Sequence, residues 1–578
     1  DKKSESGVMN EILRKRLDDF HKEVEAAGEE LRDVPLPVLT EETFGLYEKN
    51  GNRLIYEGLY FPRRKQLATF GLLSIWHKKA EDLKKLQEII TEICGERCWA
   101  LPAHVDRKEK DWDITVDLFA SETAQTLAEI TAQLGDLLPE TIHQMVKREV
   151  DRRIFDSYLS KPFGQWKWEH YMNNWVAVCA GSIGSAAMYL LNDHPEKQKK
   201  IIDRVIETMP CYLEGMMDDG TCPEGMSYFT YGMAYFAGFA EQLYRFTNHK
   251  VNLMADPKVE RIARFQQTCY FDSGLTVSFS DGSCRDKFRL GLTCYLASLY
   301  PGIRIPQIDS VMKYTDDSCY RFMANYCDDI WVKTYGEHVS LKGEGEASMT
   351  VLPSAQWAVG RGDNGTGFAA KGGHNDEPHN HNDVGSFLYL AGKDMFLTDL
   401  GCGEYTKDYF GEKRYEILNN RSKGHNVPLI DGKEQLPGTS YRASLFKGDF
   451  QGEEGEVTIS FGDAYPQGLL KEAVRRLVFR KKDGALNIKD SFLLDQGKEV
   501  TENLVTQYEP FIENKKVTLL GKDGKLTIFV PDGEDITAKK EEFPNHKGKT
   551  ECLYRITWTV KAVNKLAESR FDIRWEKV

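Results

Sequence analysis

The 578 residues include 76 lysines and arginines against 89 aspartates and glutamates, giving a formal net charge of −13. This acidic excess argues against non-specific binding to nucleic acid and against attraction to an anionic membrane surface. The length exceeds what one hydrophobic core usually fills, so two or three domains are expected. No apolar run approaches the ~20 residues that a membrane-spanning helix requires, so we expect a soluble protein.

The twelve cysteines are scattered, mostly in apolar or aromatic surroundings, and only Cys94 and Cys98 lie close together on one predicted helix. This usage is more typical of free thiols in a reducing compartment than of a disulfide framework, so it favours a cytoplasmic over a periplasmic location. The first residue is Asp1, and the charged opening DKKSESGV lacks the apolar core of a signal. Whether an export signal preceded it stays open.

The hydrophobic period changes near residue 330. Up to about residue 326, long segments such as AEDLKKLQEIITEIC repeat apolar residues at steps of three and four, which predicts helices. From about residue 331, short runs such as GSFLYLAG and EVTISFG alternate with turn residues, which predicts strands. Because no helices are predicted between these strands, they should form antiparallel sheets in a sandwich. We predict a helical domain over residues 1–328 and a β-sandwich domain over residues 329–578.

Two segments of the helical half contain side chains suited to a sugar-binding groove. In CWALPAHVDRKEKDW, His104 lies in a break between helices, where it either faces a groove or belongs to an ordinary turn. In WKWEHYMNNWVAVCAG, Asn173, Asn174 and Trp175 precede a helix of small residues. An asparagine at this place is commonly an N-cap, although amides beside aromatic rings also suit a sugar platform.

A third segment, TCPEGMSYFTYGMAYF, opens a helix at Pro223 and Gly225. Glu224, Tyr228 and Tyr231 recur on one face of it. Such an aromatic stripe usually belongs to a core. Phenol hydroxyls need partners when buried, however, and a polar cleft supplies them more easily than a dry core.

The strongest indication of function lies in residues 372–400, GGHNDEPHNHNDVGSFLYLAGKDMFLTDL, followed by GHNVPLI. The polar residues gathered there are His374, His379, His381, Asp383, Asp399 and, in the second segment, His425. The chain has thirteen histidines in all, so three within eight residues favour chemistry over packing. The alternative is a solvated polar loop.

These motifs resemble those of the heparinase II/III-like family of polysaccharide lyases, which includes oligoalginate lyases. The resemblance covers most of the chain. It rests on five segments in family order: NNW before a small-residue helix, PEG-x-x-Y-x-x-Y, H-N-H-N-D-x-G-S-F, TDLG and GHNVPLI. The fold that it implies is an N-terminal α/α toroid, an incomplete barrel of helices, followed by an antiparallel β-sandwich.

The activity implied by the resemblance is β-elimination at a uronic acid, which leaves an unsaturated uronate product. The C5 proton lies beside a carboxylate, so donors must first neutralise that charge, a role that fits Asn174 together with Asn173. Tyr228 or Tyr231 would act as base, acid or both, with Tyr231 slightly preferred. Because a phenol has a pKa of ~10, the phenolate needs a neighbouring positive charge or imidazole, for which His379 is the candidate.

Further site residues follow from the same resemblance. Tyr409 matches a second active-site tyrosine by spacing, with Tyr405 and Tyr415 as rivals. The substrate contacts that we expect, besides Asn173, are Trp175, His104, Glu224 and Arg421. A polyanionic substrate would also need a local basic cleft. The candidates for it are Arg285, Arg361, Arg414, Arg421 and Lys423.

Where the family carries a structural metal, its ligands would map to His381, Asp399 and His425. Two imidazoles and a carboxylate suit Zn²⁺, with water or another side chain completing the shell. The trio also fits a 2-His-1-carboxylate iron site. We favour zinc, with manganese as an alternative; a hydrogen-bonded cluster without metal stays open. No organic cofactor is expected.

The expected partner is therefore an anionic uronate polysaccharide such as heparan sulfate, hyaluronan or chondroitin, and neither nucleic acid nor a membrane. In the alginate-lyase relatives a histidine is expected after the asparagine, whereas Trp175 follows Asn174 here. This departure favours a glycosaminoglycan over alginate. The alternatives are an oligoalginate lyase, a non-catalytic carbohydrate-binding protein with a structural metal, or an iron oxygenase. Uronate epimer, sulfation, endo or exo action and oligomeric state cannot be read from the residues.

Overall fold

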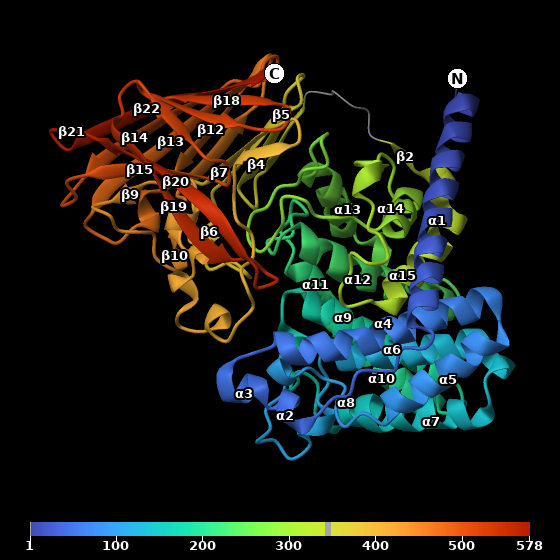
Figure 1. Cartoon of the computed structure of the whole chain (residues 1–578). Coiled ribbons are helices and arrows are strands. Elements are labelled where there is room, and N and C mark those ends of the chain that lie inside the picture. Colours follow the sequence, from blue (N-terminus) through green and yellow to red (C-terminus); the bar gives the residue numbers. More distant parts are fainter. Residues whose placement is uncertain (1, 342–347) are drawn as a thin grey trace.

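The chain consists of a helical part and a β part that lie side by side (Figure 1). The computed structural model describes residues 2–341 and 348–578. The longer helices are α1 (Lys2–Leu31), α4 (Leu54–His77), α5 (Ala80–Cys94), α6 (Leu118–Leu134), α7 (Glu140–Val150), α9 (Asn174–Leu190), α10 (Pro195–Thr208), α12 (Met226–Phe246), α13 (Pro257–Cys269), α14 (Leu290–Leu299) and α15 (Phe322–Tyr335). The short ones are α2 (Glu41–Phe44), α3 (Leu46–Asn50), α8 (Asp156–Ser160) and α11 (Pro210–Glu214).

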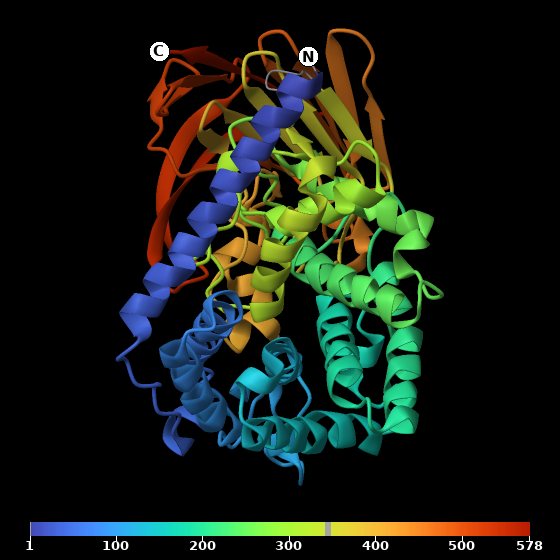
Figure 2. The same ribbon diagram turned by 90° about the vertical axis from the view of Figure 1, so that its right-hand side faces the viewer.

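The helices follow one another around an open ring, from blue on one side through teal to green on the other (Figure 2). Helix α9 packs against α6, α10 and α12. Its small residues permit this close approach, because a Cβ at Gly184 would lie 2.5 Å from the ring of Phe239 on α12. The contact aligns the N-terminal ends of α9 and α12, where the predicted asparagine and tyrosine motifs lie.

The β part contains three antiparallel sheets. The five-stranded sheet consists of β3 (Ser348–Leu352), β4 (Trp357–Arg361), β5 (Thr366–Lys371), β7 (Phe387–Ala391) and β8 (Asp394–Leu397), in that order. The four-stranded sheet has the order β19 (Glu534–Pro544), β20 (Thr550–Val560), β15 (Val500–Thr506) and β9 (Leu429–Ile430).

The nine-stranded sheet has the order β11 (Leu445–Asp449), β12 (Glu454–Ser460), β13 (Leu470–Arg480), β14 (Leu486–Leu494), β22 (Leu566–Lys577), β18 (Gly524–Phe529), β17 (Lys516–Leu520) and β16 (Phe511–Glu513), with β21 (Ala562–Val563) beside β22. Two small pairs complete the strands: β1 (Arg304–Ile305) with β2 (Ser340–Leu341), and β6 (His374–Asn375) with β10 (Gly438–Arg442). Strand β14 alternates buried and less buried residues, as expected for a sheet with one face on a core. Across that core, Phe368 of the five-stranded sheet meets Phe479 of the nine-stranded sheet, with ring centroids 4.8 Å apart.

The predicted fold class, an α/α toroid followed by an antiparallel β-sandwich, is therefore confirmed. The boundary predicted at 328/329 falls inside α15, because the helix continues to Tyr335 and buries Trp331 in the helical core. All twelve cysteines are free thiols. Within residues 2–341 and 348–578, no helix is both long and apolar enough to cross a membrane.

Candidate active site and metal centre

A cavity of about 750 Å³ lies where the helical and β parts meet. Loops and helix ends of the toroid form one wall, and loops of the β part form the other. The predicted residues that line it are His104, Asn173, Asn174, Trp175, Tyr228, Tyr231, His379, Tyr405, Arg414 and Tyr415. Segments far apart in the sequence thus meet in one place, which makes this cavity the candidate active site.

The two asparagines at the start of α9 have different roles. Asn173 is the N-cap, and its side-chain oxygen accepts a hydrogen bond from the Trp175 N–H at 3.0 Å. The backbone N–H of Asn174 donates to Glu224 at 3.3 Å. The side-chain oxygen of Asn174 is buried and has no hydrogen-bond partner among the residues that the structure describes. A buried amide in this state calls for a ligand or water, so Asn174 is the better candidate for substrate contact.

Tyr228 lies against His379 in the cavity. Helix α12 begins after Gly225, whose φ of 103° favours glycine, and this turn places Tyr228 at the wall. The Tyr228 ring stacks on the His379 ring with centroids 4.3 Å apart, and its hydroxyl is hydrogen-bonded to the Tyr405 hydroxyl. Burial, together with the charge of Asp281, raises the pKa of Tyr228 well above 10. At rest, Tyr228 therefore carries its proton.

Tyr231 has different partners, although it also reaches the cavity. Its hydroxyl donates to Glu122 on α6, and the Arg321 guanidinium lies 3.8 Å from its ring centroid. Burial raises the pKa of Glu122 to about 7 in spite of Arg321 and this hydrogen bond. The geometry therefore favours Tyr228 over Tyr231 as the tyrosine beside His379, whereas the sequence had slightly favoured Tyr231.

His379 is held between two carboxylates. Its Nδ1 lies 2.6 Å from Asp281, and its Nε2 lies 3.3 Å from Glu224. Burial alone would lower the pKa of His379, but these two carboxylates raise it to about 9. The ring is therefore an imidazolium at neutral pH. This is the positive charge that a phenolate at Tyr228 would require.

Asp281 connects the active site to the histidine motif behind it. The buried carboxylate accepts hydrogen bonds from the Tyr405 hydroxyl at 2.9 Å and from the Tyr409 hydroxyl, in addition to its contact with His379. It also lies 3.1 Å from Nε2 of His381. Asp281 could not be predicted from the sequence, because a single aspartate in the turn FSDGS, 98 residues before His379, has no spacing that links it to the site.

The tyrosines of the β part are arranged differently from the prediction. Tyr405 lines the cavity and contacts both Tyr228 and Asp281. Tyr409 is fully buried behind Asp281 and is not among the described residues that line the cavity. Tyr415 lines the cavity and accepts a hydrogen bond from the Asn380 side chain at 3.2 Å. Tyr405 is thus the tyrosine of the β part beside Tyr228, because the 3-10 turn at residues 408–410 directs Tyr409 inward.

Some of the residues predicted to contact substrate line the cavity, and others lie elsewhere. Nδ1 of His104 lies 2.7 Å from Asp117, and its ring meets Trp175 at the cavity wall with centroids 4.7 Å apart. Arg421 lies outside the cavity lining and is paired with Glu434. The basic candidates Arg361 and Lys423 also lie elsewhere, whereas Arg414 lines this cavity and Arg285 lines a neighbouring one.

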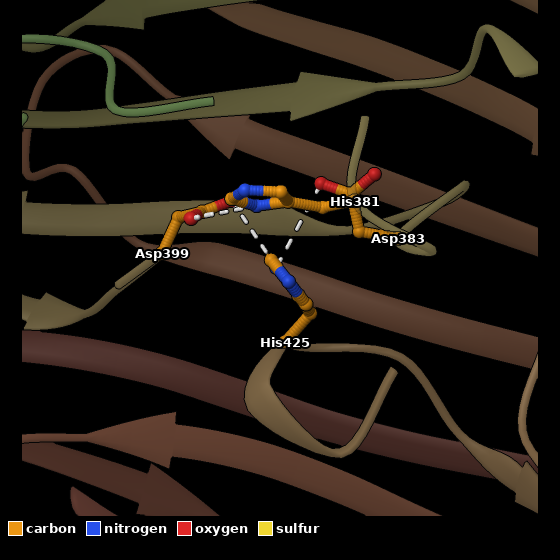
Figure 3. A group of neighbouring side chains, drawn as sticks. All are labelled: His381, Asp383, Asp399 and His425. Carbon is orange, nitrogen blue, oxygen red and sulfur yellow. Dashed lines mark ion pairs between the residues drawn. The ribbon is translucent and has the colours of Figure 1, made fainter. Parts of the chain in front are cut away.

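Four buried side chains form a second centre behind the cavity (Figure 3): His381, Asp383, Asp399 and His425, called the His–Asp cluster below. One ligand atom from each lies within 4.8 Å of all the others. Asp383 belongs to the predicted histidine motif but was not among the predicted ligands. Its position two residues after His381 was the available signal.

The inward-facing atoms of the His–Asp cluster, which contact one another as ion pairs such as His425 Nδ1 with Asp399 Oδ2 at 3.1 Å, fit a metal. Nδ1 of each histidine and Oδ2 of each aspartate are buried without a hydrogen-bond partner in the described parts of the chain. The other polar atoms of these side chains have partners outside the cluster. Nε2 of His381 contacts Asp281, Nε2 of His425 contacts the Asn419 carbonyl at 2.8 Å, and Oδ1 of Asp383 contacts Lys371 at 2.7 Å. Such outer contacts orient ligands at metal sites. Two nitrogens and two oxygens suit a tetrahedral divalent ion such as zinc, although the donor set does not identify the metal.

Comparisons with known proteins agree with the fold of this chain. Residues 345–576 match the family model for the heparinase II/III-like C-terminal domain. No curated protein sequence gives a match. Among solved structures, heparinase III has a TM-score of 0.64 at 13% identity, over 91% of this chain and 77% of that chain. The heparan sulfate lyase HepC from Pedobacter heparinus has a TM-score of 0.60 at 14% identity, with the same coverage.

A chondroitin AC lyase from Streptomyces coelicolor A3, in complex with chondroitin sulphate, is also similar. Its TM-score is 0.58 at 11% identity, over 97% of this chain and 79% of that chain. At these identities the structural likeness establishes the fold, and the match to residues 345–576 establishes the domain family. Residues 345–576 of this chain are therefore a heparinase II/III-like C-terminal domain.

Proposed function

We propose that the protein is a polysaccharide lyase that cleaves a uronate-containing glycosaminoglycan by β-elimination. The observation that carries this proposal is the meeting of Tyr228, Tyr405, His379 and the free Asn174 amide in one cavity. The similar structures include a heparan sulfate lyase and a chondroitin AC lyase, which supports a glycosaminoglycan as the substrate class.

The first requirement of this reaction is neutralisation of the uronate carboxylate. The side chain of Asn174 lies at the cavity wall, and its buried oxygen lacks a hydrogen-bond partner among the described residues. Oxygen and nitrogen of an amide are interchangeable in shape, so the NH₂ group can face a substrate carboxylate. A donor placed at the carboxylate lowers the cost of forming negative charge at C5.

The second requirement is proton transfer at C5 and at the leaving oxygen. Tyr228 first gives its resting proton to solvent in the cavity. As the phenolate it then takes the C5 proton; the electron pair forms the C4–C5 double bond, and the C4–O bond breaks. The leaving oxygen takes a proton from Tyr405, whose hydroxyl contacts that of Tyr228. A proton passed from Tyr228 back to Tyr405 closes the cycle. The His379 imidazolium beside the Tyr228 ring stabilises the phenolate state.

We assign the His–Asp cluster a structural divalent ion, with zinc preferred and manganese as an alternative. When bound, such an ion supplies positive charge among buried carboxylates and fixes the strand entry that contains His379. The residues His381, Asp383, Asp399 and His425 would hold it. The contact between His381 and Asp281 then fixes the carboxylate that orients His379.

The deciding experiment is incubation with heparan sulfate, hyaluronan, chondroitin and alginate while ultraviolet absorbance is recorded. Elimination yields a conjugated double bond and an increase in absorbance without consuming oxygen. We expect this increase with a glycosaminoglycan. Turnover of alginate alone would indicate an oligoalginate lyase, and binding without any increase would indicate a carbohydrate-binding protein; either result refutes the proposal.

A further inference from the structure

A second cavity of about 490 Å³ adjoins the candidate active site. The two cavities share Tyr228, Tyr231, Ser318 and Arg321 in their linings. The second cavity is therefore separated from the reacting groups by no more than these shared side chains. A polymer bound in the first cavity can extend into the second.

The lining of the second cavity is mainly basic, so we call it the cationic cavity. Five of its charged residues are cations and three are aspartates: Arg285, Lys287, Arg289, Arg321 and Lys547 against Asp286, Asp316 and Asp317. Arg289 and Arg321 are paired with Asp317. In the described ranges, no carboxylate lies within 4.0 Å of the charged groups of Arg285, Lys287 or Lys547. Arg285 and Lys287 donate instead to the backbone carbonyls of Lys393 and Asp309.

The aspartates of the cationic cavity are themselves engaged. Asp286 is buried and accepts a hydrogen bond from the Ser227 hydroxyl at 2.6 Å. Asp316 accepts one from the backbone N–H of Lys313 at 2.8 Å. Asp317 pairs with two arginines. With five cations against three aspartates, the lining keeps a net positive charge and therefore attracts anions.

A hairpin of the β part stands between the two cavities. Strands β19 and β20 extend from the sandwich toward the helical part (Figure 1). At their tip, His546 lines the active-site cavity and meets Tyr405 edge-on with ring centroids 4.6 Å apart. The next residue, Lys547, lines the cationic cavity. The tip of this hairpin thus contributes an aromatic ring to the active-site cavity and a cation to the cationic cavity.

We propose that the cationic cavity is a subsite for an anionic sugar of the chain whose uronate lies in the active-site cavity. This inference rests on the proposed lyase function. Its ligand is a sulfate or carboxylate group, which Arg285, Lys287 and Lys547 bind. The contact contributes to binding but not to proton transfer, so it lowers KM for chains that reach the cavity and leaves kcat unchanged.

The test uses Lys287→Ala and Lys547→Ala, with Lys539→Ala as a matched control on the same hairpin. Lys539 is exposed, is paired with Glu541 and lines neither described cavity. Steady-state kinetics are measured on the shortest oligosaccharide that is cleaved and on chains two and four sugars longer. We expect each cavity variant to raise KM about 3- to 10-fold on the longer chains only, with less effect at high salt. Lys539→Ala should match the wild type.

An equal change on short and long chains, or no change on either, would overturn the subsite. Binding of desulfated and of carboxyl-reduced chains, which requires no turnover, then distinguishes the two anionic groups, because the variant effect on affinity disappears with the group that is bound. Calorimetric titration of these chains into each protein separates this inference from the lyase proposal. Binding that the cavity variants weaken, without any turnover, would refute the lyase and retain the subsite. Absence of binding to the wild type would refute both.

Discussion

Replacing Tyr228 by phenylalanine removes one hydroxyl and keeps the ring that stacks on His379. The lost hydrogen bond is the one to Tyr405, whose hydroxyl keeps its contact with Asp281. The free energy of unfolding should therefore fall by only ~1 kcal/mol. Turnover should fall by roughly 10²–10⁴-fold or more, the range typical of general acid–base groups.

The matched variant is Tyr231→Phe, three residues further along α12. There the hydroxyl donates to the buried Glu122, so its removal leaves a buried carboxylate with one donor fewer. The expected cost is ~1–3 kcal/mol of stability, with turnover largely retained.

Both variants are assayed by ultraviolet absorbance and by urea unfolding. The comparison is diagnostic because loss of turnover is expected in Tyr228→Phe, whereas the larger loss of stability is expected in Tyr231→Phe. Retained turnover in Tyr228→Phe, or its loss in Tyr231→Phe at unchanged stability, would refute the assignment of Tyr228. If neither variant slows the reaction, the tyrosine mechanism itself is wrong.

Three further predictions concern other groups. His379→Ala should abolish elimination while the metal content is unchanged, since the His–Asp cluster keeps its ligands; retained turnover would remove His379 from the mechanism. Asp383→Asn should lower the metal bound per chain, measured by elemental analysis after dialysis, and unchanged content would exclude Asp383 as a ligand. Burial, opposed by Tyr189 and Arg245, raises the pKa of Glu129 from 4.5 to about 7. Because the pKa of Glu129 is higher in the folded than in the unfolded state, the protonated side chain favours the fold. This contribution to stability is fully present below about pH 4.5 and is lost as pH rises to about 7. Between about pH 4 and 8 in urea unfolding, the wild type should therefore lose roughly 3 kcal/mol more stability than Glu129→Gln, and parallel profiles would contradict this.

The sequence predicted the fold class because helix and strand periods are local properties. The change of period near residue 330 reflects apolar faces that each element must bury against its neighbours. The boundary was less accurate, since the apolar run around Trp331 suits a strand and a buried helix equally. Local pattern could not decide which, and packing against the toroid core places it in α15.

The candidate site was predictable only where its residues belong to contiguous motifs. Asn174, Tyr228 and His379 each lie in such a motif, and all three line the cavity. The choice between Tyr228 and Tyr231 depends on the direction in which α12 faces α6, which the sequence does not contain. Likewise Asp281 lies in a turn after α13, and only the tertiary fold brings it to His379.

The position of Asp281 also explains how the two centres depend on each other. His379 and His381 lie two residues apart in the chain, and one carboxylate from the helical part contacts both. The same carboxylate accepts a hydrogen bond from the hydroxyl of Tyr405, and this hydroxyl also contacts that of Tyr228 on α12. Placement of the two tyrosines side by side therefore depends on how the toroid, the β part and the His–Asp cluster are positioned relative to one another. Since a shift of about 1 Å in a catalytic group can cost 10²-fold in rate, the proposed mechanism predicts that the buried cluster influences the rate without touching substrate.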